Sequence, residues 1–251
     1  MPHVIEDVVE AYFHQKPPRK LRTKVPSRET RNLLATLEHY QGFYEHSRLS
    51  QTISQLLQAM LRTATVPPTR ILSLGLGSLN IGRGQTRRLK QLTILLALRD
   101  TLKQSTGKLV EVYAQDPAFT GADEAFLHIL GIHILRTPSG SELGEAASII
   151  DHSTIVYSPF LTLEAYEQLL MNTASPVQYL VGDDFNSLLS KWPKRSTERG
   201  QVESILKSSL SAYRKRAIPG KDFWVEEDAT FPMAMYERAG DTVKRTRKAK
   251  L

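Results

Sequence analysis

The residues best suited to chemistry gather in one short segment, Gly75-Leu-Gly-Ser-Leu-Asn80. Its glycines allow a sharp turn, and a serine hydroxyl on such a turn can act as a nucleophile or bind an anion beside the backbone N–H groups of a following helix. We therefore place the functional site of the chain around Gly75–Ser78. The competing interpretation is that the glycines only allow the chain to turn tightly beneath a neighbouring helix.

The same segment is similar to the start of a dinucleotide-binding loop, G-x-G-x-x-G, but Asn80 occupies the place of the third glycine. A lone G-x-G is weak evidence for a nucleotide. No histidine follows Ser78 at a spacing typical of a Ser-His-Asp triad. We therefore predict neither a nucleotide cofactor nor a hydrolase triad, and the sequence indicates no other cofactor.

Polar residues also follow three further apolar runs, ending at Asp116, at Ser158 and at the pair Asp183-Asp184. Asp116 either binds a ribose hydroxyl or caps the turn that it forms with Pro117. The paired carboxylates could orient an amine or bind a metal. The alternative for Asp184 is that it caps the next helix. The predicted substrate-binding residues are Gly75, Gly77, Asn80, Asp116, Ser158 and Asp184.

Cysteine and histidine usage excludes several classes of site. The chain has no cysteine, which excludes disulfides, thiolate catalysis and cysteine-bound zinc, and fits a reducing compartment. Its seven histidines show no metal-binding spacing, so no metal site is predicted. No apolar run is long enough for a membrane helix, and no secretion signal is present. We expect a cytoplasmic protein without a membrane partner, and the basic C-terminal tail also fits nuclear targeting.

The chain is basic, with a formal net charge of +7. Basic residues are concentrated in residues 16–24, in residues 191–216 and in the C-terminal tail. One interpretation is that these segments are simply solvated or act as targeting signals. The other is that they attract a polyanion such as RNA. The residues predicted to contact RNA are Arg195, Arg214, Lys215, Arg216, Lys244 and Arg245.

Strands and helices must position these side chains, and the hydrophobic pattern predicts both. Short apolar runs predict strands over 70–76, 109–114, 132–135, 154–157 and 177–181. Apolar residues at spacings of three and four predict helices between them, over 87–104, 123–130, 143–150 and 162–172. The alternation predicts a Rossmann-like three-layer α/β sandwich with a mainly parallel five-stranded sheet, whose ligands bind beyond the carboxyl ends of the strands.

Helical extensions flank this predicted sheet. The pattern indicates helices over 29–64, divided at Gly42, and over 186–191 and 197–214, whereas residues 218–251 are irregular with one apolar patch. Residues 1–28 are predicted to form a basic N-terminal arm, interrupted by prolines. Residues 29–251 are predicted to form a single α/β domain, with a helical and basic extension over 191–251.

Several motifs in this order resemble one known family. They include ILSLGLGSLN (71–80), VEVYAQDPAFTGADEAFLHILGIHIL (110–135), GEAASIIDHSTIVYSPF (144–160) and YLVGDDFNS (179–187). Together they resemble the Sensitivity-to-Red-Light-Reduced-like domain family over about residues 47–190. The resemblance implies one of two functions. Some members look like regulators in circadian, haem or cytoskeletal processes, and some similar fungal proteins look like arginine-containing cyclodipeptide synthases.

The synthase branch implies a transferase that joins two aminoacyl groups from charged tRNAs into a diketopiperazine. In that reading Ser78 is the acyl acceptor or a hydroxyl ligand, Tyr157 or Tyr179 is a hydrogen-bonding partner, and Asp183 or Asp116 recognises a cationic amino acid. Bacterial synthases have the pattern G-x-S-x-x-N-S, and this chain departs from it with G-L-G-S-L-N. The alternative is a non-catalytic regulatory protein that binds a small ligand in the same cleft.

Overall fold

A computed structural model describes residues 27–80, 82–137, 143–171, 176–220, 222–228 and 232–239. Its centre is one seven-stranded sheet in the order β3-β2-β1-β4-β5-β7-β6. Five strands are parallel: β1 (Arg70–Leu74), β2 (Glu111–Gln115), β3 (Ile132–Ile134), β4 (Thr154–Ser158) and β5 (Tyr179–Asp183). Two are antiparallel: β6 (Tyr213–Ile218) and β7 (Met233–Arg238).

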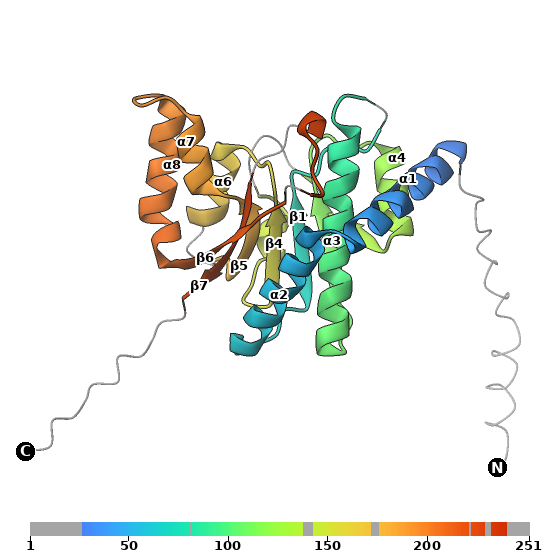
Figure 1. The fold of residues 1–251 in the computed structure, drawn as a ribbon, viewed down its shortest axis with the longest axis horizontal. Coiled ribbons are helices and arrows are strands. Elements are labelled where there is room, and N and C mark those ends of the chain that lie inside the picture. The colour runs from blue at the N-terminus through green and yellow to red at the C-terminus, as the bar shows by residue number, and fades with distance from the viewer. Residues whose placement is uncertain are drawn as a thin grey trace, which may run out of the picture.

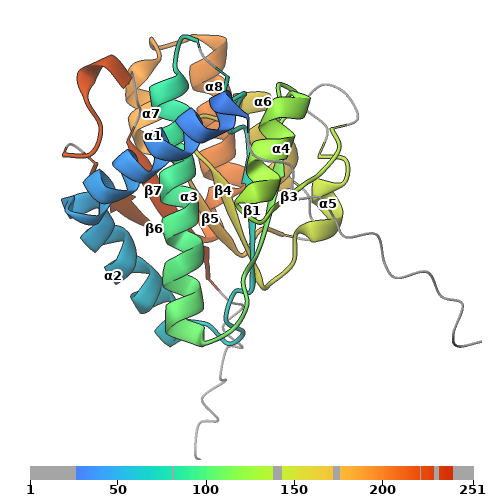
Figure 2. The ribbon, with the colours of Figure 1, turned by 90° about the vertical axis from the view of Figure 1, so that its right-hand side faces the viewer.

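Helices cover both faces of the sheet, which makes a three-layer Rossmann-like α/β fold (Figures 1 and 2). One face carries α1 (Arg28–Glu45), α2 (Arg48–Thr63), α3 (Gln85–Thr106) and α4 (Gly121–Ile129). The other carries α5 (Ala146–Ile149), α6 (Leu163–Met171), α7 (Phe185–Lys191) and α8 (Thr197–Ser208). The predicted fold class is therefore confirmed. No helix in the described ranges is long and apolar enough to cross a membrane.

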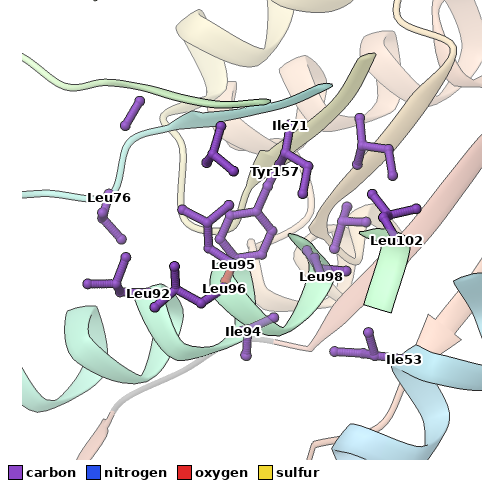
Figure 3. Close-up of a cluster of buried hydrophobic side chains, with 14 of the residues drawn as sticks. Ile53, Ile71, Leu76, Leu92, Ile94, Leu95, Leu96, Leu98, Leu102 and Tyr157 are labelled. Atoms are coloured by element: carbon purple, nitrogen blue, oxygen red, sulfur yellow. The ribbon is translucent and has the colours of Figure 1, made fainter. Parts of the chain in front are cut away.

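The helix α3 forms the centre of the larger hydrophobic core. Its leucines pack onto Ile71 of β1 and Tyr157 of β4 (Figure 3). The opposite side of α3 contacts α1 and α2, so the helix is enclosed on both sides. This explains why buried residues occur around nearly the whole helix, including the polar residues Lys90, Gln91 and Thr93.

The sheet has two more strands than the sequence predicted. The helix predicted over 197–214 ends at Ser208, and β6 follows after a short 3-10 turn. The stretch over 218–251 expected to be irregular contains β7, which pairs antiparallel with β5 and β6. The strand β6 was missed because it lies at the sheet edge, where Arg214, Lys215 and Arg216 interrupt any apolar run.

The break between the first two helices also differs from the prediction. Gly42 lies inside α1, and the chain is divided instead at Ser47, whose hydroxyl caps α2 by accepting a hydrogen bond from Ser50 N at 3.1 Å. A single glycine is tolerated inside a helix, whereas a capped serine starts a new one. Ser47, and not Gly42, therefore determines where the first helix ends and the second begins.

Candidate functional site

The loop between β1 and α3 lies at the carboxyl edge of the sheet and turns on two left-handed glycines. Gly75 and Gly77 both have φ of 75°, a conformation that other residues rarely adopt. A Cβ atom on Gly77 would lie 2.7 Å from Cδ of Arg88. The glycines therefore allow the tight turn, which was one of their two predicted roles. The helix α3 begins at Gln85, two residues before its predicted start, so its first N–H groups do not directly follow Ser78.

Two aspartates from the neighbouring β2–α4 segment hold this loop in place. Asp116 Oδ2 accepts a hydrogen bond from Gly77 N at 2.7 Å, and its Oδ1 accepts one from Ala118 N at 2.8 Å. Asp123 Oδ2 accepts from the Ser78 hydroxyl at 2.8 Å, and its Oδ1 accepts from Leu79 N at 2.7 Å. Asp116 thus caps its own turn, as one alternative had it, and also fixes the glycine turn.

Asp123 is a buried hub that the sequence analysis did not single out. It is 1% exposed, and Thr120 donates to its Oδ2 through both its backbone N and its hydroxyl, at 2.8 Å each. With Ser78 and Leu79 this makes four donors on one carboxylate, so Asp123 orients the Ser78 hydroxyl. The sequence signal was the capping box Thr120-x-x-Asp123 at the start of α4.

A groove of about 480 Å³ opens beside this loop, within the size range of ligand pockets. It lies between the first turns of α1, the loop residues Leu79 and Asn80, and the N-termini of α3 and α4. Glu29 is the only charged residue among its described lining residues. Asn80 was predicted from the sequence, whereas Glu29 was not, because nothing in its local pattern indicates that α1 folds back over the loop.

Asp183 lies at the carboxyl end of β5 and is 3% exposed. Its two carboxylate oxygens accept from Phe160 N at 3.2 and 3.1 Å, and the Tyr166 hydroxyl lies 3.2 Å from Oδ2. Burial raises the pKa of the Asp183 carboxyl from 3.8 to about 7, against the lowering effect of these hydrogen bonds. The carboxylate supports Phe160, a non-glycine residue with φ of 70°, and so shapes the β4–α6 turn.

Asp184 caps α7, which was one of its two predicted roles. Its side chain accepts hydrogen bonds from Asn186 N and Ser187 N, and its Oδ1 is paired with Lys215 Nζ at 2.5 Å. Arg216 of the same strand lies 3.6 Å from a carboxylate oxygen of Glu237. The predicted RNA-contacting residues on β6 are therefore partly engaged in ion pairs within the protein.

Two other residues in the predicted RNA-binding set, Arg195 and Arg214, are exposed. Lys244 and Arg245 lie outside the described residues.

The two candidate tyrosines lie away from the β1 loop. The Tyr157 hydroxyl donates to the carbonyl of Gln91 at 3.0 Å inside the core, and burial raises its pKa. Tyr179 begins β5, at the opposite edge of the sheet from Asp183. In the described part of the chain, Ser78 Oγ is hydrogen-bonded to Asp123 and Asn80 and to neither tyrosine. Ser158 is fully buried at the end of β4, and its hydroxyl has no partner among the described residues.

The site thus combines a fixed glycine turn, an oriented serine and an adjacent groove at the carboxyl edge of a Rossmann-like sheet. Within the described ranges, no cluster of three or more histidine or acidic side chains could hold a metal ion. The sequence profile of the SRR1 domain matches residues 45–233, about three quarters of the chain. The chain therefore belongs to the SRR1 domain family, as its motifs indicated.

Other comparisons add little. No curated protein matches the chain significantly. Among solved structures, a cofactor-bound protein from MTB is 11% identical, with a TM-score of 0.47, and covers 82% of this chain and 89% of its own.

The plantazolicin methyltransferase BamL, in complex with a triazolic desmethylPZN analogue and SAH, is 11% identical with a TM-score of 0.40. The match covers 84% of this chain and 98% of BamL. A methyltransferase from Geobacter sulfurreducens is 14% identical with a TM-score of 0.35. The match covers 95% of this chain and 98% of that methyltransferase. No functional argument follows at these TM-scores.

Proposed function

We propose that the groove beside Asn80 binds an aminoacyl group with a cationic side chain, and that the chain is an aminoacyl-tRNA-dependent transferase of the cyclodipeptide synthase type. The observation that carries this proposal is the charge of the groove, because Glu29 is the only ionisable residue among its described lining residues. A carboxylate in a polar groove favours a guanidinium, which it can bind through paired hydrogen bonds.

The chemistry requires little activation, because an aminoacyl ester is already reactive. Attack by Ser78 Oγ on the ester carbonyl would transfer the acyl group to the serine, and the serine proton would leave with the ribose hydroxyl of the tRNA. The amine of the Ser78-bound aminoacyl group would then attack the ester of a second aminoacyl-tRNA and release that tRNA as its free ribose hydroxyl. The amine of the second residue would finally attack the Ser78 ester, which closes the diketopiperazine and restores the Ser78 hydroxyl. The Ser78–Asp123 hydrogen bond of 2.8 Å supports this role by fixing the direction of the hydroxyl.

Production of diketopiperazines in a bacterial host tests the proposal. Mass spectrometry of the medium is expected to detect arginine-containing diketopiperazines with the parent chain and at least a hundredfold less with Ser78→Ala. The control is Ser190→Ala, which removes an exposed hydroxyl on α7. Folded parent protein that yields no product would reject the transferase, and full activity of Ser78→Ala would reduce Ser78 to a turn residue.

Contact with tRNA is a separate part of the proposal. The exposed residues Arg195 and Arg214 would contact the phosphate backbone, together with the basic tail containing Lys244 and Arg245. Binding of tRNA should weaken with rising salt, and truncation of the tail should lower the affinity.

A second candidate function is a non-catalytic ligand-binding regulator. Its support is the number of hydrogen bonds that tie the β1 loop to Asp116 and Asp123, because such a loop also serves as a rigid wall for a ligand. A small cationic ligand that binds the parent chain without any acyl transfer would favour this candidate.

A further inference from the structure

We propose that the first turn of α3 is a binding site for a phosphoryl group, held by Arg87 and Arg88 above the backbone of Gly84. This site is distinct from the Glu29 groove in charge, and the inference does not depend on acyl transfer. It rests on the positions of the two guanidinium groups and on the absence of an ion-pair partner for either of them among the described residues.

Both guanidinium groups converge on Gly84. A methyl group built on Gly84 would lie 3.3 Å from Arg88 Nη1 and 3.7 Å from Arg87 Nη2. The Arg88 side chain passes over Gly77, and its Nη1 donates to the carbonyl of Arg83 at 3.2 Å. The Arg87 guanidinium lies 5.2 Å from the centre of the Phe160 ring. The β1 loop and the β4–α6 turn thus fix these two cations side by side.

The two cations have no counter-charge among the residues that the structure describes. No ion pair involving Arg87 or Arg88 is formed within the described part of the chain, and the Nε atom of each is buried without a hydrogen-bond partner. They also stand at the N-terminus of a 22-residue helix, where the helix dipole favours negative charge. The first turn holds no acidic residue, and no side chain caps it.

A bound anion would supply the missing counter-charge at the start of α3. A phosphoryl group has oxygens enough for two planar guanidinium forks, which suit phosphate better than point charges do. The backbone N–H groups of Thr86 and Arg87 donate to no acceptor among the described residues, and they supply further donors. Gly84 has φ of 81°, and a side chain there would crowd the Arg88 guanidinium. The phosphoryl group can come from a phosphorylated small molecule or from an RNA backbone.

Thermal unfolding of the full chain tests the site. Inorganic phosphate should raise the Tm of the parent above its value in chloride of equal ionic strength, and Arg87→Gln/Arg88→Gln should abolish this rise. The control is Lys103→Gln/Lys108→Gln, which removes two charges at the other end of α3 and should keep the rise. Without phosphate, the arginine variant should have a Tm equal to or above that of the parent, because a cationic repulsion is relieved.

A second variant separates the loss of phosphate binding from a loss of side-chain packing. Arg87→Lys/Arg88→Lys keeps both charges but loses the paired geometry, and should bind phosphate at least tenfold more weakly while remaining folded. Affinities for AMP and for a short single-stranded RNA, measured by calorimetry, separate the two sources of the phosphoryl group. The proposal is overturned if phosphate does not stabilise the parent, if it stabilises the glutamine variant equally, or if the lysine variant binds as tightly as the parent.

Discussion

At the scale of single residues, Asp123 decides the shape of the β1 loop. It accepts four hydrogen bonds from Ser78, Leu79 and Thr120 while almost fully buried. Asp123→Ala should lower the free energy of unfolding by about 2–4 kcal/mol, because it leaves buried donors unpaired and removes a helix cap. Urea unfolding measures this loss. Asp100→Ala, at a half-exposed site on α3, is the control, and an equal effect of both variants would contradict the assignment.

Asp183 should make stability depend on pH. Its pKa rises from 3.8 to about 7 in the folded protein, mainly through burial. The folded state therefore binds the proton more tightly than the unfolded state, and this contribution is full below about pH 4 and lost as the pH rises to about 7. The total is about 4 kcal/mol, from the shift of roughly three pKa units.

Asp183→Asn tests this directly, because the amide cannot ionise but can still accept from Phe160 N. Urea unfolding between pH 4 and pH 8 should show a smaller decline for the variant than for the parent, and the variant should be the more stable protein above pH 7. Glu164→Gln, at an exposed site on α6, should leave the decline unchanged. Identical pH profiles for the parent and Asp183→Asn would show that the carboxyl does not titrate in this range.

At the scale of elements, the segment over 222–228 is attached to α3 by a buried ion pair. Lys90 Nζ lies 2.6 Å from Asp228 Oδ2 and 3.0 Å from the carbonyl of Phe223. The rings of Tyr40, Phe223 and Trp224 surround the ammonium group at 5.5–5.9 Å. These contacts join α1, α3 and the segment before β7, which explains why the apolar patch around Phe223 folds back onto the body.

Breaking this pair on one side should be costly. Lys90→Met leaves Asp228 buried without a counter-charge and should lower the free energy of unfolding by about 3–5 kcal/mol. The double variant Lys90→Met/Asp228→Asn should recover part of the loss. Glu203→Gln, which breaks an exposed pair on α8, should cost about 0.5 kcal/mol or less. Equal losses for the buried and the exposed pair, measured in urea, would reject this explanation.

The sequence located all five parallel strands. Each of their ends lies within two residues of its predicted position, because each strand is marked by a short apolar run, although β2 and β3 are only partly buried. It failed at β6 and at Gly42, where an edge strand and a capping serine carry weaker or competing signals. The direction of side chains was not predicted either, since Tyr157 of β4 and Tyr179 of β5 face the hydrophobic core.

At the scale of the whole molecule, the site depends on contacts that no local pattern shows. The carboxyl edge could be predicted, because parallel strands end together, and the glycine turn was found there. The groove arises only because α1 packs over α3 and brings Glu29 near Asn80. Likewise, Asp123 reaches Ser78 across 45 residues of sequence. The sequence therefore located the edge that carries the site, and the fold added Asp123 and Glu29 to it.

The most direct test of the groove as a ligand site is calorimetric binding of arginine methyl ester, which mimics a cationic aminoacyl ester. The parent chain should bind it, and Glu29→Gln should bind it about tenfold more weakly, as expected for a lost charged hydrogen bond. Norleucine methyl ester should bind weakly to both, and Glu164→Gln should behave like the parent. No binding by the parent, or equal binding by Glu29→Gln, would contradict the assignment of this groove.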